Sequence, residues 1–228
     1  MDARACGAGL VTQHSQHVVS TPVPKQATLN DRLFAVEPDT LVLAHPVGAA
    51  IDVDTGVWGL ATATFNVSRT HRYRLSRVWD ERRPRLNFLM LNPSTADAFV
   101  VDPTVRRCLG FARLWGYGSL EVTNVFALRA TDPRELRLND DPVGAGNDDA
   151  ILAAAHCADL VICAWGVHAA YLGREREVLD LLADAGERVS TLTRTKDGHP
   201  GHPLYVAANT EPLHWDYEAH AAEVLAAS

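Results

Sequence analysis

Asn92 and the residues after it are the first group suited to chemistry. Asn92 stands directly before Pro93 in the segment LNPSTADA. A residue before proline favours an extended backbone, which directs the Asn92 amide outward. That amide can accept a hydrogen bond from water while it donates one to a ligand. Ser94 and Thr95 add hydroxyls, and Asp97 and Asp102 are candidate bases, although Ser94, Thr95 and Asp102 are also residue types that cap turns and helices.

Two histidines form a second group in the segment KDGHPGHPLY, where His199 and His202 are separated by glycine and proline. Proline and glycine specify a tight path that holds an imidazole in place, where it can stabilise a developing anion. A metal site with Asp197 is the alternative, but the spacing matches no standard zinc signature. We therefore expect no metal and no cofactor. Either histidine is a candidate for the anion-stabilising role, and Lys196 is a candidate substrate contact.

Two further segments supply candidate binding residues. Asn124 interrupts the apolar run VTNVFAL, and Arg129 follows it. A buried amide without a partner costs roughly 1–3 kcal/mol, so either the protein or a ligand must satisfy Asn124. Such an amide can contact one edge of a nucleobase. Trp165 and His168 in the segment AWGVH form either ordinary packing or the wall of a pocket.

The stretch SRTHRYRLSRVWDERRPR contains seven arginines and two acids. One interpretation is a solvated edge whose arginines pair with surface carboxylates. The other is a rim that contacts phosphate, because the planar guanidinium suits phosphate better than an ammonium does. In that case Arg72 and Arg74 belong to the substrate site.

Composition restricts the class of protein. The chain has 228 residues, a formal net charge of −7 and 47% hydrophobic residues. The acidic balance argues against a protein that coats duplex DNA. No apolar run reaches the roughly 18 residues of a membrane span, and the first residues do not resemble a secretory signal. The cysteines form no CxxC pair, and Cys108 and Cys163 lie in apolar patterns typical of core thiols, so a reducing cytoplasm is expected.

The elements that must position these residues alternate along the chain. Apolar runs predict strands at 86–91, 119–128, 158–166 and 189–195, and amphipathic or alanine-rich patterns predict helices at 102–117, 148–156 and 171–188. This order predicts a three-layer α/β/α sandwich with a central, largely parallel four-stranded sheet. The predicted organisation is a poorly ordered tail over 1–30, an appended β segment over 31–65 and the α/β domain over 66–228. The polar loops all follow strands, so they should meet at the carboxyl edge of the sheet, where ligands bind.

Five motifs resemble the bacterial and phage family known as domain of unknown function 1643. They are MLNPSTAD, the helix start DPT-RRC, N-FA-RATDP, AWG and TKDGHP-HPLY. The resemblance covers roughly residues 62–215. The family name implies no activity.

The same runs more distantly resemble the uracil-DNA glycosylase superfamily, which has a three-layer fold around four parallel strands. FLMLNPS is similar to its first motif and places Asn92 at the water-positioning residue. VTNVFALRATDP is similar to the run whose Asn reads the base, at Asn124. AWG is similar to a turn after the third strand, and GHPGHPLY to the loop whose His stabilises the departing base. The resemblance implies three catalytic functions: placing water, reading the base and stabilising its anion.

Three hypotheses follow. The first is a hydrolase that cleaves the N-glycosidic bond of a nucleobase in a nucleoside, a nucleotide or DNA. The second is a non-catalytic module that binds a nucleotide or nucleic acid in the same pocket. The third is a metal-dependent hydrolase built on His199, His202 and Asp197. The expected partner is a nucleobase-containing small molecule or a nucleic acid and not a membrane, and the oligomeric state is left open.

Overall fold

The computed structural model describes residues 49–57 and 59–217. The described residues all belong to the second of the two units into which the chain divides, Pro46–Ser228. The tail predicted for residues 1–30 and the first part of the segment predicted for 31–65 lie outside the described residues. Within them, no helix is long and apolar enough to cross a bilayer.

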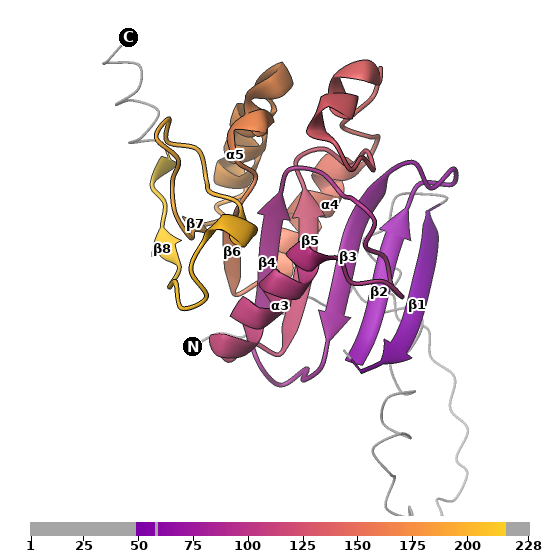
Figure 1. Cartoon of the computed structure of the whole chain (residues 1–228), viewed down its shortest axis with the longest axis vertical. Helices are drawn as coiled ribbons and strands as arrows, with labels where there is room; N and C mark the ends of the chain where they lie inside the picture. Colours follow the sequence, from indigo (N-terminus) through magenta and orange to yellow (C-terminus); the bar gives the residue numbers. More distant parts are fainter. Residues whose placement is uncertain (1–48, 58, 218–228) are drawn as a thin grey trace, which may run out of the picture. The chain divides into compact units, whose positions relative to one another are not determined.

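One mixed sheet of eight strands organises the second unit, in the order β1-β2-β3-β5-β4-β6-β7-β8 (Figure 1). The strands are Ala50–Gly56 (β1), Gly59–Phe65 (β2), Arg72–Val78 (β3), Arg85–Met90 (β4), Ser119–Asn124 (β5), Leu160–Cys163 (β6), Val189–Thr191 (β7) and Leu213–His214 (β8). Strands β5, β4, β6 and β7 are mutually parallel. Their carboxyl ends therefore meet at one edge.

The sheet is wider than the four strands predicted from the sequence. Strands β1, β2 and β3 form an antiparallel extension that joins the parallel set at β5, and β8 pairs antiparallel with β7. The arginine-rich stretch supplies β3, so it is an internal strand with partners on both sides rather than an edge. Because β3 runs opposite to β5, its first residue, Arg72, lies near the carboxyl ends of the parallel strands.

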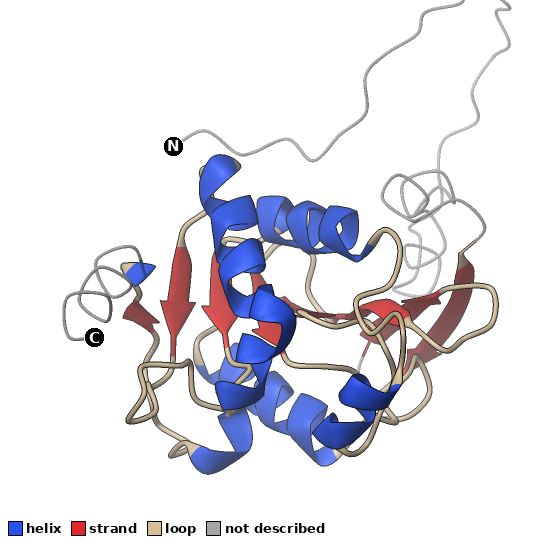
Figure 2. Cartoon of the chain, turned by 90° about the horizontal axis from the view of Figure 1, so that it is seen from above, coloured by secondary structure: helices blue, strands red, loops and turns tan. Residues whose placement is uncertain are grey.

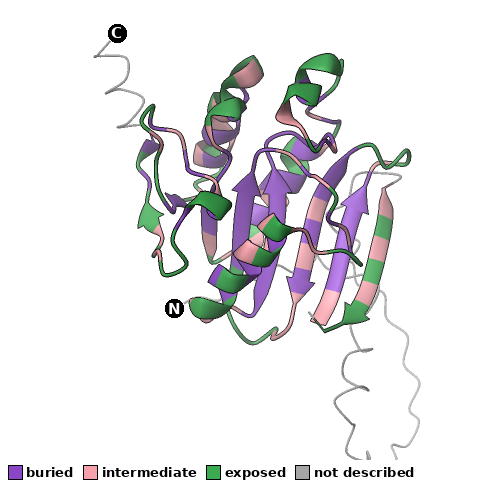
Figure 3. Ribbon diagram, viewed as in Figure 1, coloured by how far each residue is buried: buried purple, intermediate pink, exposed green. Residues whose placement is uncertain are grey.

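Helices cover both faces of the sheet, as the view from above shows (Figure 2). They are Pro103–Leu114 (α3), Asn147–Cys157 (α4) and Arg174–Asp184 (α5). Val105, Leu109 and Phe111 of α3 pack with Phe88 and other residues of one sheet face. Helices α4 and α5 pack against the opposite face in a second apolar cluster. Strands β4 and β5 between these layers are almost entirely buried (Figure 3).

Local sequence determines where α3 begins. The Asp102 carboxylate accepts a hydrogen bond from the Val105 backbone N–H at 2.8 Å, and Pro103 occupies the first helical position. Proline is favoured there because its missing N–H has no partner in the first turn of any helix. The helix therefore starts where the loop that carries Asn92 ends.

A β-bulge determines which arginines face which layer. Thr64 pairs with Arg74 and Phe65 pairs with Arg72, so Tyr73 is an extra residue on β3. A bulge changes the face to which the neighbouring side chain points. Arg72 accordingly contacts Ala96 on the α3 side, whereas Arg74 lines a small groove with residues of α4.

Candidate functional site

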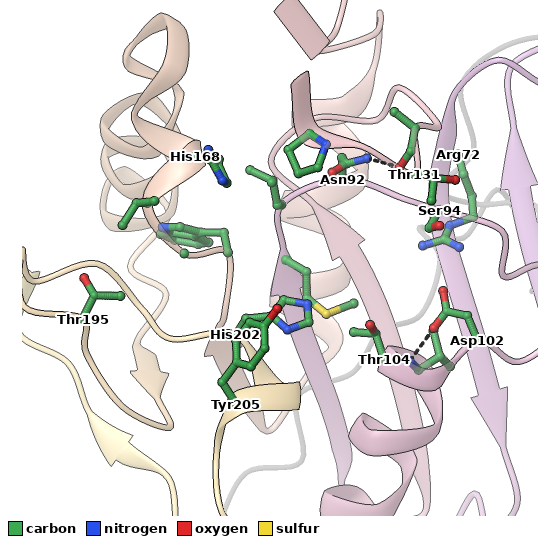
Figure 4. Close-up of a pocket in the computed structure, with 18 residues that line it drawn as sticks. Arg72, Asn92, Ser94, Asp102, Thr104, Thr131, His168, Thr195, His202 and Tyr205 are labelled. Atoms are coloured by element: carbon green, nitrogen blue, oxygen red, sulfur yellow. Dashed lines mark hydrogen bonds between the residues drawn. The ribbon is translucent and has the colours of Figure 1, made fainter. Parts of the chain in front are cut away.

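A pocket of about 510 Å³ opens at the carboxyl edge of the parallel strands (Figure 4). It receives residues from the loops after β4, β5, β6 and β7, from the first turn of α3 and from the start of β3. Its lining residues are Arg72, Met90, Leu91, Asn92, Ser94, Asp102, Thr104, Val105, Ala130, Thr131, Pro133, Trp165, Gly166, Val167, His168, Thr195, His202 and Tyr205. Its volume lies within the range of small-molecule sites.

The amide of Asn92 is held in one orientation. Its Nδ2 donates to the backbone oxygen of Ala130 at 2.7 Å and to that of Pro93 at 3.1 Å. Both amide hydrogens therefore have acceptors, and Oδ1 is the atom left to accept a hydrogen bond from a pocket molecule. The strand-to-loop turn at Pro93 thus presents a fixed acceptor to the pocket.

Arg72 is a buried cation at the pocket wall, with an exposed fraction of 2%. It donates to the Ala96 backbone oxygen at 2.7 Å and to Asn124 Oδ1 at 3.3 Å. Burial lowers the pKa of Arg72 to about 10, an effect that the nearby Asp102 carboxylate partly opposes. The guanidinium is therefore protonated at neutral pH.

His202 lines the pocket, and its Nδ1 accepts a hydrogen bond from the Leu204 N–H at 3.3 Å. Neutral His202 therefore carries its proton on Nε2, which leaves that nitrogen as a donor. Burial lowers the pKa of His202 below its ordinary value, and the charge of Asp102 works in the opposite direction. The imidazole beside the pocket is consequently biased toward the neutral form.

His199 lies outside the residues that line the pocket and belongs to a separate network. Its Nδ1 contacts Glu175 Oε2 at 2.6 Å, and Glu175 Oε1 accepts the indole N–H of Trp165 at 2.8 Å. Trp165 is a pocket wall residue, so this network ties the loop before His202 to that wall. The structure separates the two histidines that the sequence left as alternatives: His202 lines the pocket, and His199 supports it.

The acid of the pocket is Asp102 rather than Asp97. Asp97 Oδ1 accepts the backbone N–H groups of Phe99 and Val100, both at 2.8 Å, and it does not line the pocket. Asp102 does line it, although one of its oxygens caps α3.

Several predicted substrate residues lie outside the pocket wall. Pro93 and Thr95 belong to the first loop without lining the pocket, and exposed Lys196 does not line it either. Arg129 packs over the Phe65 ring at 5.2 Å. Arg74 pairs with Glu121 at 2.7 Å on the α4 side, because the bulge separates its direction from that of Arg72.

Asn124 is buried behind Arg72 and is 1% exposed. Its Oδ1 accepts from Arg72, and its Nδ2 has no hydrogen-bond partner among the described residues. Asn124 therefore positions the arginine that the pocket exposes, and it is not itself a lining residue.

Six residues predicted from the sequence line the pocket: Arg72, Asn92, Ser94, Trp165, His168 and His202. Four hydroxyl residues in the wall were not predicted as site residues: Thr104, Thr131, Thr195 and Tyr205. Tyr205 lay within the quoted HPLY motif and was the one with a usable pattern. The threonines occur in ordinary turn and helix-start contexts, which do not distinguish them from capping residues.

No group of three or more His, Cys, Asp or Glu side chains within residues 49–57 and 59–217 is arranged to hold a metal ion. His199 and His202, the basis of the metal hypothesis, belong to two different environments. Cys108 and Cys163 are free and buried, and burial raises the pKa of both thiols. Both are core residues, as their apolar sequence context predicts.

The lowered pKa of His202 predicts how stability depends on pH. The unfolded chain takes up this proton near pH 6.5, whereas the folded chain resists protonation until lower pH. The contribution of neutral His202 to the free energy of unfolding is therefore fully present above pH 6.5, and it is lost as pH falls toward the lowered pKa. We expect His202→Gln to show a shallower fall in unfolding free energy than wild type below pH 6.5, measured by urea denaturation across pH. Parallel curves for the two proteins would contradict the assignment.

The fold and the pocket together define an α/β protein with a polar site at the carboxyl edge of its parallel strands. A family model described as "Protein of unknown function (DUF1643)" matches residues 72–204, more than half of the chain. The chain therefore belongs to this family. No curated protein and no solved structure matches it.

Proposed function

We propose that the protein hydrolyses the N-glycosidic bond between a nucleobase and its sugar. The observation that carries this proposal is the pairing of Asn92 and His202 in one pocket. Asn92 offers a fixed acceptor for a water molecule, and His202 is biased toward a neutral ring that can donate through Nε2. A positioned water and a donor for the leaving base are two requirements of this reaction.

The reaction places each group in a defined role. The glycosidic C–N bond breaks, and its electron pair leaves with the base. Asn92 Oδ1 orients a water whose oxygen bonds to the anomeric carbon of the sugar. His202 donates a hydrogen bond to the base oxygen on which negative charge develops. The attacking water gives one proton to solvent or to Asp102, and the leaving base takes one proton from solvent, so that one water is consumed and a free sugar and a neutral base are formed.

The resemblance to the uracil-DNA glycosylase superfamily supports the proposal in two respects. Four parallel strands lie within the sheet, and the loops that follow them carry the similar motifs in the same order. Asn124 departs from its implied role, because Arg72 occupies its oxygen. Base contacts therefore fall to the residues that line the pocket.

The test is release of free base from a panel of nucleosides, 5′-mononucleotides and base-modified oligonucleotides, read by mass spectrometry. The proposal expects at least one compound to yield its intact base. Binding without release from any compound would instead favour a non-catalytic module that uses the same pocket.

The two histidines should respond differently to the same substitution. We expect His202→Ala to lower the rate constant for base release by about 100-fold, because it removes a donor at the developing charge. We expect His199→Ala to lower the unfolding free energy by about 1–2 kcal/mol, the loss of a charge-assisted bond, with a far smaller effect on release. Single-turnover kinetics and urea denaturation of both variants measure this. The reverse ranking of rates would assign the chemistry to His199.

A further inference from the structure

One end of the pocket concentrates the features of an anion site. Arg72, Ser94 and Asp102 lie at this end, whereas His168 and Thr195 lie at the other, with Asn92 and His202 between them (Figure 4). We infer that the Arg72 end binds the terminal phosphate of a 5′-mononucleotide, so that the substrate is a free nucleotide. This inference rests on the proposed function for the base and adds the identity of the group attached to the sugar.

The guanidinium of Arg72 is held in place without being neutralised. The acceptors that fix it, Ala96 O and Asn124 Oδ1, are both uncharged. Among the described residues Arg72 forms no salt bridge, although the charge of Asp102 acts on it at longer range, and its Nε has no hydrogen-bond partner. Arg174, by contrast, is equally buried but pairs with Asp148 and Glu177. A buried, unpaired cation at a pocket wall favours an anionic ligand.

Neighbouring groups fit a sugar phosphate. The hydroxyl of Ser94 lies beside Arg72 and that of Thr104 lies beside Asp102 (Figure 4), and both can donate to phosphate oxygens. Asp102 is the opposing charge there, but its Oδ1 is occupied by the Val105 N–H at the start of α3. Its other oxygen can accept from a sugar hydroxyl. The cation and the carboxylate together therefore match a ligand that carries both an anion and hydroxyls.

Burial distinguishes a terminal phosphate from an internal one. The Arg72 side chain is 98% buried, since its exposed fraction is 2%. At an internal phosphodiester the nucleic-acid chain continues on both sides of the phosphate. A nearly enclosed guanidinium leaves little room for the chain on both sides. A phosphomonoester ends at this point. The net charge of −7 also gives the chain no general attraction for a polyanion.

The test uses ribose 5-phosphate and ribose, which carry no base and need no turnover. We expect wild type to bind ribose 5-phosphate at least tenfold more tightly than ribose in an NMR titration. Arg72→Lys should lower the affinity for ribose 5-phosphate by about 10- to 100-fold and leave the affinity for ribose almost unchanged, because the bidentate, fixed donor is lost. Arg77→Lys is the matched control, since Arg77 is also buried on β3 and also donates to a carbonyl of the same loop, but it does not line the pocket.

Each outcome decides the inference. Equal binding of ribose 5-phosphate and ribose by wild type overturns it, whether or not free base is released elsewhere. An equal loss in Arg77→Lys also overturns it, because loop support would then explain the effect. If Arg72→Lys does not fold, Ser94→Ala takes its place in the titration. We then expect a severalfold lower affinity for ribose 5-phosphate, and an unchanged affinity overturns the inference. Tighter binding of an oligonucleotide with only internal phosphates would replace the free nucleotide with nucleic acid.

Discussion

Replacing Asn92 by alanine should lower the rate constant for base release by about 100-fold or more, while the affinity for a nucleotide changes little. The reason is geometric: the two backbone acceptors of Nδ2 fix the position of Asn92 Oδ1, and in the proposed reaction this oxygen orients the attacking water. Loss of this position removes an orienting contact that acts on the reaction more than on binding. Single-turnover kinetics and equilibrium binding of one nucleotide measure the two quantities separately.

Thr95→Ala is the matched control for the loop. Thr95 lies three residues after Asn92, is exposed and does not line the pocket, so its substitution should leave the release rate unchanged. If Asn92→Ala weakens binding as much as it slows release, the residue supports pocket shape. A wild-type release rate in Asn92→Ala would remove Asn92 from the mechanism.

Trp165→Ala should lower the free energy of unfolding by about 3–5 kcal/mol and also weaken nucleotide binding. Trp165 is among the largest fully buried side chains, packs at 6.0 Å from Trp215 and lines the pocket. Truncation of a buried tryptophan leaves a cavity in addition to the lost transfer energy. Denaturation in urea and a binding titration of the same variant measure the two effects.

A phenylalanine substitution isolates the hydrogen bond to Glu175. Trp165→Phe keeps an aromatic wall and removes the N–H that Glu175 accepts, so a loss of about 1–2 kcal/mol is expected. Trp79→Phe provides the comparison. The Trp79 indole N–H donates to the Tyr117 backbone oxygen at a distance of 3.1 Å, and Trp79 does not line the pocket. Only the Trp165 variant should alter nucleotide binding. Equal effects of both on binding would show that the network does not support the pocket.

The strands and helices that position the site could be predicted from the sequence more completely than the side-chain contacts within the site. Local patterns were sufficient for the parallel strands and for α3, because apolar runs and the Asp102–Pro103 start are properties of adjacent residues. The collection of four loops at one edge followed from parallel topology alone. Strands β1 to β3 were harder to place, because their pairing with β5 depends on residues distant in the chain.

The roles of individual side chains in the site depend on tertiary contacts, which the spacing of residues along the sequence does not reveal. The bulge at Tyr73 separates Arg72 from Arg74, although both stand in one arginine-rich run. Asn124 was correctly expected to need a partner for its buried amide, but one partner is Arg72 within the protein. His199 and His202 share a motif, yet only the position of Glu175 on α5 determines which of them is bound away from the pocket.

The most direct test of the proposed reaction is a turnover of the best nucleotide substrate in water enriched in ¹⁸O, followed by mass spectrometry of every product. Attack of water at the anomeric carbon predicts an intact base without ¹⁸O, a sugar phosphate that carries the label on its sugar, and no labelled inorganic phosphate. Asn92→Ala should form these products about 100-fold more slowly. Label in the base, label in inorganic phosphate, or bound nucleotide without any product would each contradict hydrolysis of the N-glycosidic bond.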